Sequence, residues 1–512
     1  MSETETGDRH DQTRVSSSSP SQQALPPRVR TVLAARLDRL SPATRDLASL
    51  AAAIGRAFTL PVLRSAHGGD EDALVRGLDE LWQRRIVRER GLDAYDFTHD
   101  KLREAAYGAL SPARRGLLHR QVARSLEAVH ALDLDPVSGQ IAVHYERAGL
   151  PHPAVPYYLR AGEAASRIYA NDEAEASFRR GLALLEAGPG EGRQEGAREM
   201  AARLYEGLGQ VLRLTGQHKE ARKTLDRALG EIEADDWLSG SRILVQIGLT
   251  CWAQGQLDQA LDNYDEAHRR LGSEPAMPED TWWQQRLLVE HGRLYVHYSL
   301  GQWQEAEATV DRALPVAEQH GTPIQQTWFT GAIIGIAMRR DRYVISDETL
   351  AKAQVAKAEY EESGDLFLFA LCQLMLGWCY LLRGELDGAE REVQATLTLA
   401  ERTGDVQNRI YALTWLTFVR RMRGQVDAAR DYAARTLEAA TTAWMPEQIA
   451  AAQANQAWVA WRDGNQAEAE DLGQSALRLW QRSQWAYAFQ WTALWPLLVV
   501  ALEKEQVPEA LH

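Results

Sequence analysis

The stretch FTHDKLREAAY, residues 97–107, holds the residues of this sequence whose types and spacing most directly suggest chemistry. His99 and Asp100 stand together at the expected start of a helix. A histidine at a helix N-terminus can donate a hydrogen bond to an anion, and the helix dipole adds an attraction of about 0.3 to 1 kcal/mol. The pair therefore predicts an anion contact. The alternative is structural: Thr98 or Asp100 caps the helix while His99 packs against the preceding hairpin.

No other grouping of residues predicts catalysis, a metal site or a bound cofactor. The histidines are scattered, and the carboxylates lie at solvent-face positions of helices, where ion-paired surfaces are the default. The sequence holds no G-x-x-x-x-G-K-[ST] phosphate loop. Cys251, Cys372 and Cys379 lie inside apolar helical patterns, which favours buried, reduced thiols. We therefore expect a protein that is not an enzyme.

Tryptophan is concentrated late in the chain, where 15 of the 16 follow residue 236. Their most direct role is core packing, because stacked long helices leave wide gaps that tryptophan can fill. Some of them precede a turn glycine, on the helix that faces inward in a helical superhelix, and so could line a groove for a partner or ligand. These candidate groove residues are Trp252, Trp378, Trp415, Trp458 and Trp461.

An internal repeat must position these tryptophans. The segments TGQHKEARKTLDRAL from Thr215, LGQWQEAEATVDRAL from Leu300 and RGQVDAARDYAARTL from Arg423 share a turn glycine followed by small residues five and twelve positions later, with a period of 39 to 46 residues. A glycine can end a helix in the left-handed conformation, and a small residue lets the next helix pack closely. Each unit therefore predicts a helical hairpin that must stack on its neighbours. The turn residues are Gly216, Gly255, Gly301, Gly384, Gly424 and Gly464, with Asp341 as turn and Ser346 as small residue in the remaining gap.

Residues 26–110 show a different pattern. LPPRVRTVLAARLDRL and SPATRDLASLAAAIG predict amphipathic helices, the second capped by Ser41, and FTLPVLRSAHG and DEDALVRGLDELWQRR predict two more. IVRE and YDFTH predict two short strands. Helices followed by a hairpin are typical of a winged helix, a domain that often binds DNA. The helix at residues 70–85 carries more acidic than basic side chains, the reverse of what a groove-reading helix needs.

Charge and hydropathy exclude several classes of protein. Residues 26–130 carry 18 Lys and Arg against 13 Asp and Glu, whereas residues 131–512 carry 37 against 54. An acidic body of that size repels phosphate backbones, which makes nucleic acid an unfavoured partner. Residues 1–25 predict a disordered leader and not a secretory signal, and no run approaches the roughly 20 apolar residues of a membrane span. We expect a cytoplasmic protein without a membrane partner.

Two known families resemble parts of this chain. The turn and alanine spacing is similar to the tetratricopeptide repeat, although the period exceeds that family's usual 34 residues or so. The runs LPPRVRTVLAARLDRLSPATRDLASLAAAIGRAF, YDFTHDKLREAAY, SPARRGLLHRQVARSLE and HYERAG resemble the region after the nucleotide-binding core in bacterial signal-transducing ATPases with numerous domains. That family includes large transcriptional activators and ATPases fused to cyclases, with a winged helix and tetratricopeptide-like repeats. The resemblance implies that His99 and Asp100 read the β-phosphate of ADP, although this sequence lacks the phosphate loop of such an ATPase.

Together these patterns predict an all-α protein. Its expected parts are a disordered leader (1–25), a winged-helix-like domain (26–110), a helical connector with first repeat-like helices (111–187), a loop (188–199) and a tetratricopeptide-like superhelix (200–512). The predicted function is a non-enzymatic regulatory module that binds a protein or peptide partner in its superhelical groove. An ATPase or cyclase on another chain is a further candidate partner, and only such an ATPase would bring a nucleotide to His99 and Asp100. Two alternatives stay open: a small-molecule inducer sensor that uses the same groove, and a DNA-binding transcriptional regulator that uses the winged helix.

Overall fold

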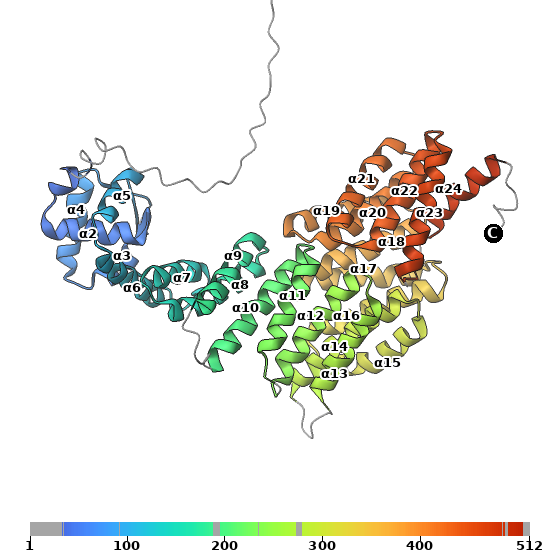
Figure 1. Ribbon diagram of the computed structural model, residues 1–512, viewed down its shortest axis with the longest axis horizontal. Helices are drawn as coiled ribbons and strands as arrows, with labels where there is room; N and C mark the ends of the chain where they lie inside the picture. Colours follow the sequence, from blue (N-terminus) through green and yellow to red (C-terminus); the bar gives the residue numbers. More distant parts are fainter. Residues whose placement is uncertain are drawn as a thin grey trace, which may run out of the picture. The chain divides into compact units, whose positions relative to one another are not determined.

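The computed structural model describes residues 33, 35–91, 93–187, 195–233, 235–272, 279–483, 485–486 and 490–504. The chain divides into two compact units, one formed by residues up to Leu134 with Val143–Leu150 and the other by Asp135–Ala142 with the chain from Pro151 onward. Figure 1 shows their helices in chain order. None of the helices in this described part combines the length and the apolar character that a bilayer-spanning segment needs.

The N-terminal unit combines helices with a small sheet. Its elements are α2 (Pro42–Ile54), β1 (Ala57–Thr59), α3 (Leu60–His67), α4 (Glu71–Gln83), β2 (Val87–Glu89), β3 (Ala94–Phe97), α5 (Asp100–Gly108) and α6 (Pro112–Val129). Strand β3 lies between β1 and β2 and pairs antiparallel with both. The sequence patterns predict β2 and β3 but wrongly place Phe58 and Thr59 in the following helix. In the structure these residues belong to β1, and α3 begins only at Leu60, because a strand of three residues with one buried side chain is too short to show a pattern.

Capping residues tie this unit together. Ser41 caps α2 as expected, its hydroxyl accepting a hydrogen bond from the N–H of Thr44. Both hydroxyls also donate to the carboxylate of Glu80 on α4, at 3.0 Å from Ser41 and 2.6 Å from Thr44. The carboxylate of Glu80 therefore holds the start of α2 against α4. The hydrogen bonds that it accepts from Thr44 and Ser41 lower the pKa of Glu80.

The second unit is a solenoid of helical hairpins. Its helices begin with η1 (Asp135–Val137), α7 (Ser138–Arg147, shared with the first unit), α8 (Pro151–Arg167), α9 (Asn171–Glu186), α10 (Glu195–Leu214), α11 (His218–Glu231), α12 (Trp237–Ala253) and α13 (Leu257–Leu271). They continue with α14 (Asp280–Ser299), α15 (Trp303–His320), α16 (Pro323–Arg340), α17 (Asp347–Ser363), α18 (Leu366–Leu382) and α19 (Leu386–Thr403). The last are α20 (Val406–Met422), α21 (Val426–Thr442), α22 (Pro446–Arg462), α23 (Gln466–Ser483) and α24 (Trp491–Glu503).

Consecutive helices from α8 to α23 pack in pairs as antiparallel hairpins, and α24 packs on α22 and α23. The expected all-α class is therefore confirmed, with the small sheet of the first unit as its exception. Of the loop expected at 188–199, residues 188–194 lie outside the described residues, and α10 already begins at Glu195.

Small residues bring the hairpins into close contact. The ring of Tyr264 on α13 is fully buried between Gly248 on α12 and Gly292 on α14. A Cβ atom would lie 2.6 Å from that ring at Gly248 and 2.4 Å from it at Gly292. The absence of a side chain on both neighbouring helices is thus what admits the tyrosine.

One hairpin turn differs from the expected frame. Between α16 and α17 the residues with positive φ are Arg342 (51°) and Tyr343 (63°), and Asp341 is only the C-cap of α16. Ser346 is exposed, and its hydroxyl accepts from the N–H of Thr349 as the N-cap of α17. The alignment of Asp341 and Ser346 with the other repeats is therefore wrong, because this turn is longer and a capping serine occupies the place of a packing residue.

The solenoid winds far enough for early hairpins to contact late ones. Asn171, at the start of α9, donates its side-chain N–H to the carbonyl of Thr403 across 2.8 Å. A Cβ atom at Gly216, in the turn after α10, would lie 2.7 Å from Val406 and 3.4 Å from Ala443. Contacts between residues so far apart in the sequence join two turns of the solenoid.

This contact repeats along the edge of the solenoid. The rings of Trp252 and Trp485 lie 5.8 Å apart, and the carbonyl of Ser299 accepts from the backbone N–H of Ala486 at 2.9 Å. We call the whole contact the seam. It joins the hairpin turns at residues 169–171, 215–217, 252–256 and 299–301 to residues 366–367, 403–406, 443–447 and 485–486.

Candidate functional site

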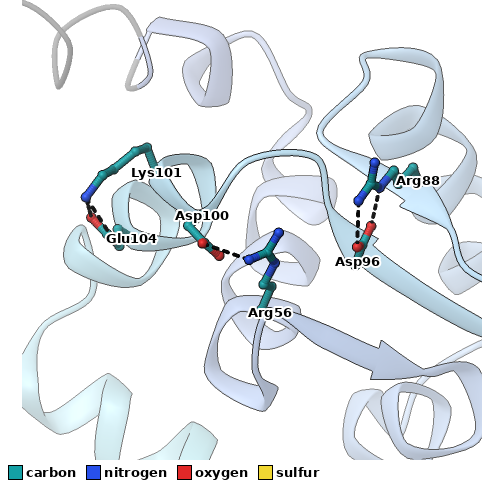
Figure 2. Close-up of polar contacts among 6 residues, drawn as sticks. All are labelled: Arg56, Arg88, Asp96, Asp100, Lys101 and Glu104. Carbon is teal, nitrogen blue, oxygen red and sulfur yellow. Dashed lines mark hydrogen bonds and ion pairs between the residues drawn. The ribbon is translucent and has the colours of Figure 1, made fainter. Parts of the chain in front are cut away.

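The start of helix α5 is an exposed corner of the N-terminal unit. His99 is the N-cap residue of α5 and is exposed, and it makes no capping hydrogen bond through its side chain. Asp100 is exposed as well, and its carboxylate pairs with Arg56 at 3.0 Å (Figure 2). The hydroxyl of Thr98 instead donates to the carbonyl of Arg85 at 2.8 Å. The structural alternative is therefore wrong: neither Thr98 nor Asp100 caps the helix, and His99 does not pack inward.

Arginines surround a surface hollow beside this corner. It has a volume of about 580 Å³ and is lined by Arg56, Arg88, Glu89, Arg90 and Asp96. Arg88 makes a two-bonded pair with Asp96, at 2.7 and 3.1 Å (Figure 2), and these hydrogen bonds lower the pKa of the Asp96 carboxyl. The guanidinium groups give this surface the means to hold an anion electrostatically.

The structure separates the candidate groove tryptophans into different environments. Trp252 is half-buried at the seam, where its Nε1 donates to the hydroxyl of Ser299 at 2.8 Å. Trp378 on α18 is half-buried, and its ring lies 5.0 Å from that of Trp415 on α20. Trp415 itself is only 8% exposed, inside a core that includes Phe418.

The remaining pair lies on α22. Trp458 is 5% exposed, whereas Trp461 is half-buried and donates its Nε1 to Glu503 at 3.2 Å. The guanidinium of Arg462 lies over both rings, at 5.3 Å from Trp458 and 5.9 Å from Trp461. Trp415 and Trp458 are thus core residues in this structure, and Trp252, Trp378 and Trp461 are the three that keep part of their surface accessible.

A small cavity lies inside the solenoid. His291, Tyr295, Trp328 and Tyr360 are among its lining residues, and its volume is about 70 Å³. His291 stacks on Trp328 with ring centroids 4.5 Å apart, and burial lowers the pKa of His291 to about 3. A drug-sized ligand needs roughly 300 to 1,000 Å³. This cavity therefore does not provide the enclosed pocket that a small-molecule sensor would use.

Sequence patterns did not predict the contacts that form the seam. Glu447, at the start of α22, is buried against Gly255 of an earlier turn, and burial raises the pKa of its carboxyl to about 8. Trp485 follows the last hairpin and faces Trp252. A repeat alignment compares neighbouring units, so it holds no signal for contacts between successive turns of the solenoid. Within the described ranges, no three His, Cys, Asp or Glu side chains gather as a metal site would require.

Comparison with known proteins gives a family match and several similar folds. The family model for the tetratricopeptide repeat matches residues 199–272, which span α10 to α13. A protein of Rhizobium meliloti (strain 1021), described as uncharacterized, is 27% identical over 306 residues, which cover 59% of this chain. The chain spans only 29% of the length of that relative.

Two solved structures are similar to the chain. One is a Signal Transduction ATPase with Numerous Domains (STAND) protein with a tetratricopeptide repeat sensor from Pyrococcus horikoshii, with a TM-score of 0.50 at 12% identity, over 88% of this chain and 65% of that protein. The other is a Rap protein complexed with competence and sporulation factor, with a TM-score of 0.45 at 15% identity, over 70% of this chain and 99% of that protein. The tetratricopeptide match and the likeness to the STAND protein confirm the predicted tetratricopeptide-like helical fold.

Proposed function

We propose that this chain is a non-enzymatic regulatory module that binds a protein or peptide partner through its helical solenoid. The observation that carries the proposal is the continuous stack of hairpins from α8 to α23, with the tetratricopeptide match inside it. Solenoids of this kind present extended surfaces to partners and need no catalytic group. The similar STAND protein is described as carrying a tetratricopeptide repeat sensor, which supports a regulatory role for the same fold here.

The partner surface in this proposal includes Trp378 and Trp461. Each is half-buried and is backed by a fully packed neighbour, Trp415 behind Trp378 and Trp458 beside Trp461. A rigidly supported aromatic ring loses little conformational entropy when it binds, which is why such residues dominate binding energy at interfaces. Trp252 serves the seam in this arrangement, because its ring and its Nε1 are both engaged there.

The N-terminal unit is proposed to be a winged helix that contacts protein. The order α2, β1, α3, α4, β2, β3 with β3 central in the sheet supports the winged-helix assignment. The outer face of α4 exposes Val75 and Trp82 beside Asp72 and Asp79. Apolar and acidic side chains suit a protein partner better than a DNA groove. His99 and Asp100, being exposed, could meet a nucleotide that an ATPase on another chain presents.

Site-specific photocrosslinking tests this function. A benzophenone amino acid is placed at Trp378 or Trp461 in the full chain, and at Thr398 as the matched control, since Thr398 is exposed on the outer helix of the same hairpin as Trp378. We expect the same partner to crosslink from positions 378 and 461 but not from 398. Trp378→Ala should also abolish capture from position 461. Equal capture from position 398, or no capture from either tryptophan position, would contradict the proposal.

A further inference from the structure

The seam borders an open cavity that the proposed partner surface does not use. It has a volume of about 580 Å³ and lies between the start of α11 and the turn that joins α21 to α22. A volume of this size matches the roughly 300 to 1,000 Å³ of small-molecule sites. The polar and aromatic residues around it include His218, Lys219, Arg222, Gln254, Gln256 and Trp444.

His218 is a buried polar group without a partner. The residue is one of those that border the cavity and is 2% exposed, and its two ring nitrogens are buried without a hydrogen-bond partner among the described residues. Burial lowers the pKa of His218 to about 4, so the ring is neutral at physiological pH, with one nitrogen as donor and the other as acceptor. An unsatisfied buried polar group costs about 1 to 3 kcal/mol. A ligand whose polar edge reached a ring nitrogen from the cavity would remove that cost.

Trp444 adopts a backbone conformation that a tryptophan rarely takes. Its φ is 55°, whereas the turns after α17 and α19 place Gly364 and Gly404 in the left-handed region. A bulky residue there costs on the order of 1 to 2 kcal/mol relative to glycine. The ring is nevertheless 65% exposed and lines the cavity, so burial in a core does not compensate for this strain. The residue type instead supplies a free aromatic face at the cavity.

The charges of the cavity favour an anion. Neither Lys219 nor Arg222 forms an ion pair with any carboxylate in the described part of the chain. Glu220, which also lines the cavity, is engaged by Arg179 at 2.8 Å. Arg222 is held in place by Gln256, whose side-chain oxygen accepts from its Nη1 at 2.7 Å. Two cations without a direct ion pair therefore border this cavity of an otherwise acidic solenoid, with the Asp226 carboxylate close enough to Arg222 to feel its charge.

We propose that this cavity binds a small planar anion, an aromatic or heteroaromatic ring that carries one carboxylate or phosphate group. The ring stacks on Trp444, the anionic group meets Lys219 and Arg222, and a polar edge of the ligand pairs with His218. Because one wall belongs to α11 and the other to the turn before α22, the bound ligand bridges the seam. Neither Trp378 nor Trp461 borders this cavity. A failure of the ligand proposal would therefore leave the proposed partner-binding function untouched, and the reverse also holds.

Ligand-observed NMR titration of the full chain tests the site. Three probes separate its chemistry: indole-3-acetate carries a carboxylate, phenyl phosphate a phosphate, and indole-3-acetamide no charge. We expect saturable binding of at least one anionic probe, and binding of the amide at least roughly tenfold weaker, a difference of about 1.4 kcal/mol. The stronger of the two anions identifies the group that the two cations prefer.

Two variants and a control make the result specific. Trp444→Gly relieves the backbone strain, so its melting temperature should be unchanged or higher while probe affinity falls at least roughly tenfold. His218→Phe should likewise fold and lose affinity, because it removes both ring nitrogens. Trp495→Ala, which alters an exposed tryptophan of α24 that does not border the cavity, should bind as the unaltered chain does. The proposal is overturned if neither anion binds saturably, if the amide binds as well as the acid, or if Trp444→Gly binds unchanged.

Discussion

The Nδ1 atoms of His119 on α6 and His144 on α7 lie 2.9 Å apart in the interior of the N-terminal unit. The Nε2 of His119 lies 2.7 Å from the hydroxyl of Tyr107. A single proton can sit between two imidazole nitrogens at this distance, but two cannot. Burial lowers the pKa of His119 to about 4 and that of His144 to about 3. Both rings are therefore neutral in the folded protein at physiological pH.

Acid should destabilise the N-terminal unit through this pair. In the unfolded chain each histidine takes up a proton near pH 6.5, whereas in the folded chain it does so only near pH 4 or below. Stability is thus fully present above about pH 6.5 and falls as the pH drops toward 4, because the unfolded state binds more protons. The measurement is the urea midpoint between pH 7 and 4.5, with NMR detection of the imidazole signals. Protonation of both rings near pH 6.5 in the folded protein would disprove this account.

Glu447 should give the opposite pH dependence in the solenoid. Burial raises the pKa of its carboxyl to about 8, from an ordinary value near 4.5. Its stability contribution is fully present below about pH 4.5 and is lost as the pH rises through about 8, because the unfolded carboxyl ionises first. Glu447→Gln should therefore stabilise the chain by on the order of 2 kcal/mol at pH 8 and change little at pH 5. Thermal denaturation at both pH values measures this, and an equal effect at both would show that the carboxyl is already ionised in the fold.

Gly292→Ala should destabilise the stack of hairpins. The new methyl group would lie 2.4 Å from the ring of Tyr264, which is buried on all sides, so the two helices must separate. Overpacking of this kind costs about 1 to 3 kcal/mol. Gly230→Ala on α11 is the matched control, because the added carbon would meet no atom within 4 Å outside its own stretch of helix backbone, and alanine favours the helix. Chemical denaturation should place the two variants on opposite sides of the unaltered protein.

A double-mutant cycle on Trp252 and Trp485 should detect the seam. Their ring centroids are 5.8 Å apart, so the two alanine substitutions should couple by about 0.5 to 1.5 kcal/mol. Trp252 with Trp82 of the other unit is the additive reference pair. If the changes in the free energy of unfolding of the two single variants simply added up in the double variant, the two turns of the solenoid would not be in contact in solution.

The chain alone should bind ADP or ATP no better than weakly and should hydrolyse neither. His99 is exposed and offers one contact to an anion, and the sequence contains no phosphate loop to hold the rest of a nucleotide. Calorimetric titration of the full chain measures this. Tight stoichiometric binding that His99→Ala abolishes would make this corner a nucleotide site in its own right.

Local patterns predicted the hairpins because each depends on residues close together in the sequence. Gly216, for example, has the left-handed backbone expected at a turn, and Ala221 is buried at the packing position five residues later. The same reasoning failed at Ser346, where a capping residue is as small as a packing residue, and at β1, which is too short to show a period. Burial of Trp415 and Trp458 could not be read from their spacing, since inward-facing helices bear both core and surface positions.

The seam should make the repeats of the solenoid unfold together under force, and not one after another. In an open solenoid each repeat contacts only its neighbours, so the repeats can unfold one at a time from either end. Here the start of α9 is hydrogen-bonded to the end of α19, and the turn after α10 lies against Val406 at the start of α20 and Ala443 just after α21. Pulling the last hairpins away must also break their contacts with the first ones, so a stretched molecule should unfold in one large step. Refolding should be slow, because segments far apart in the sequence must come together before the seam can form again.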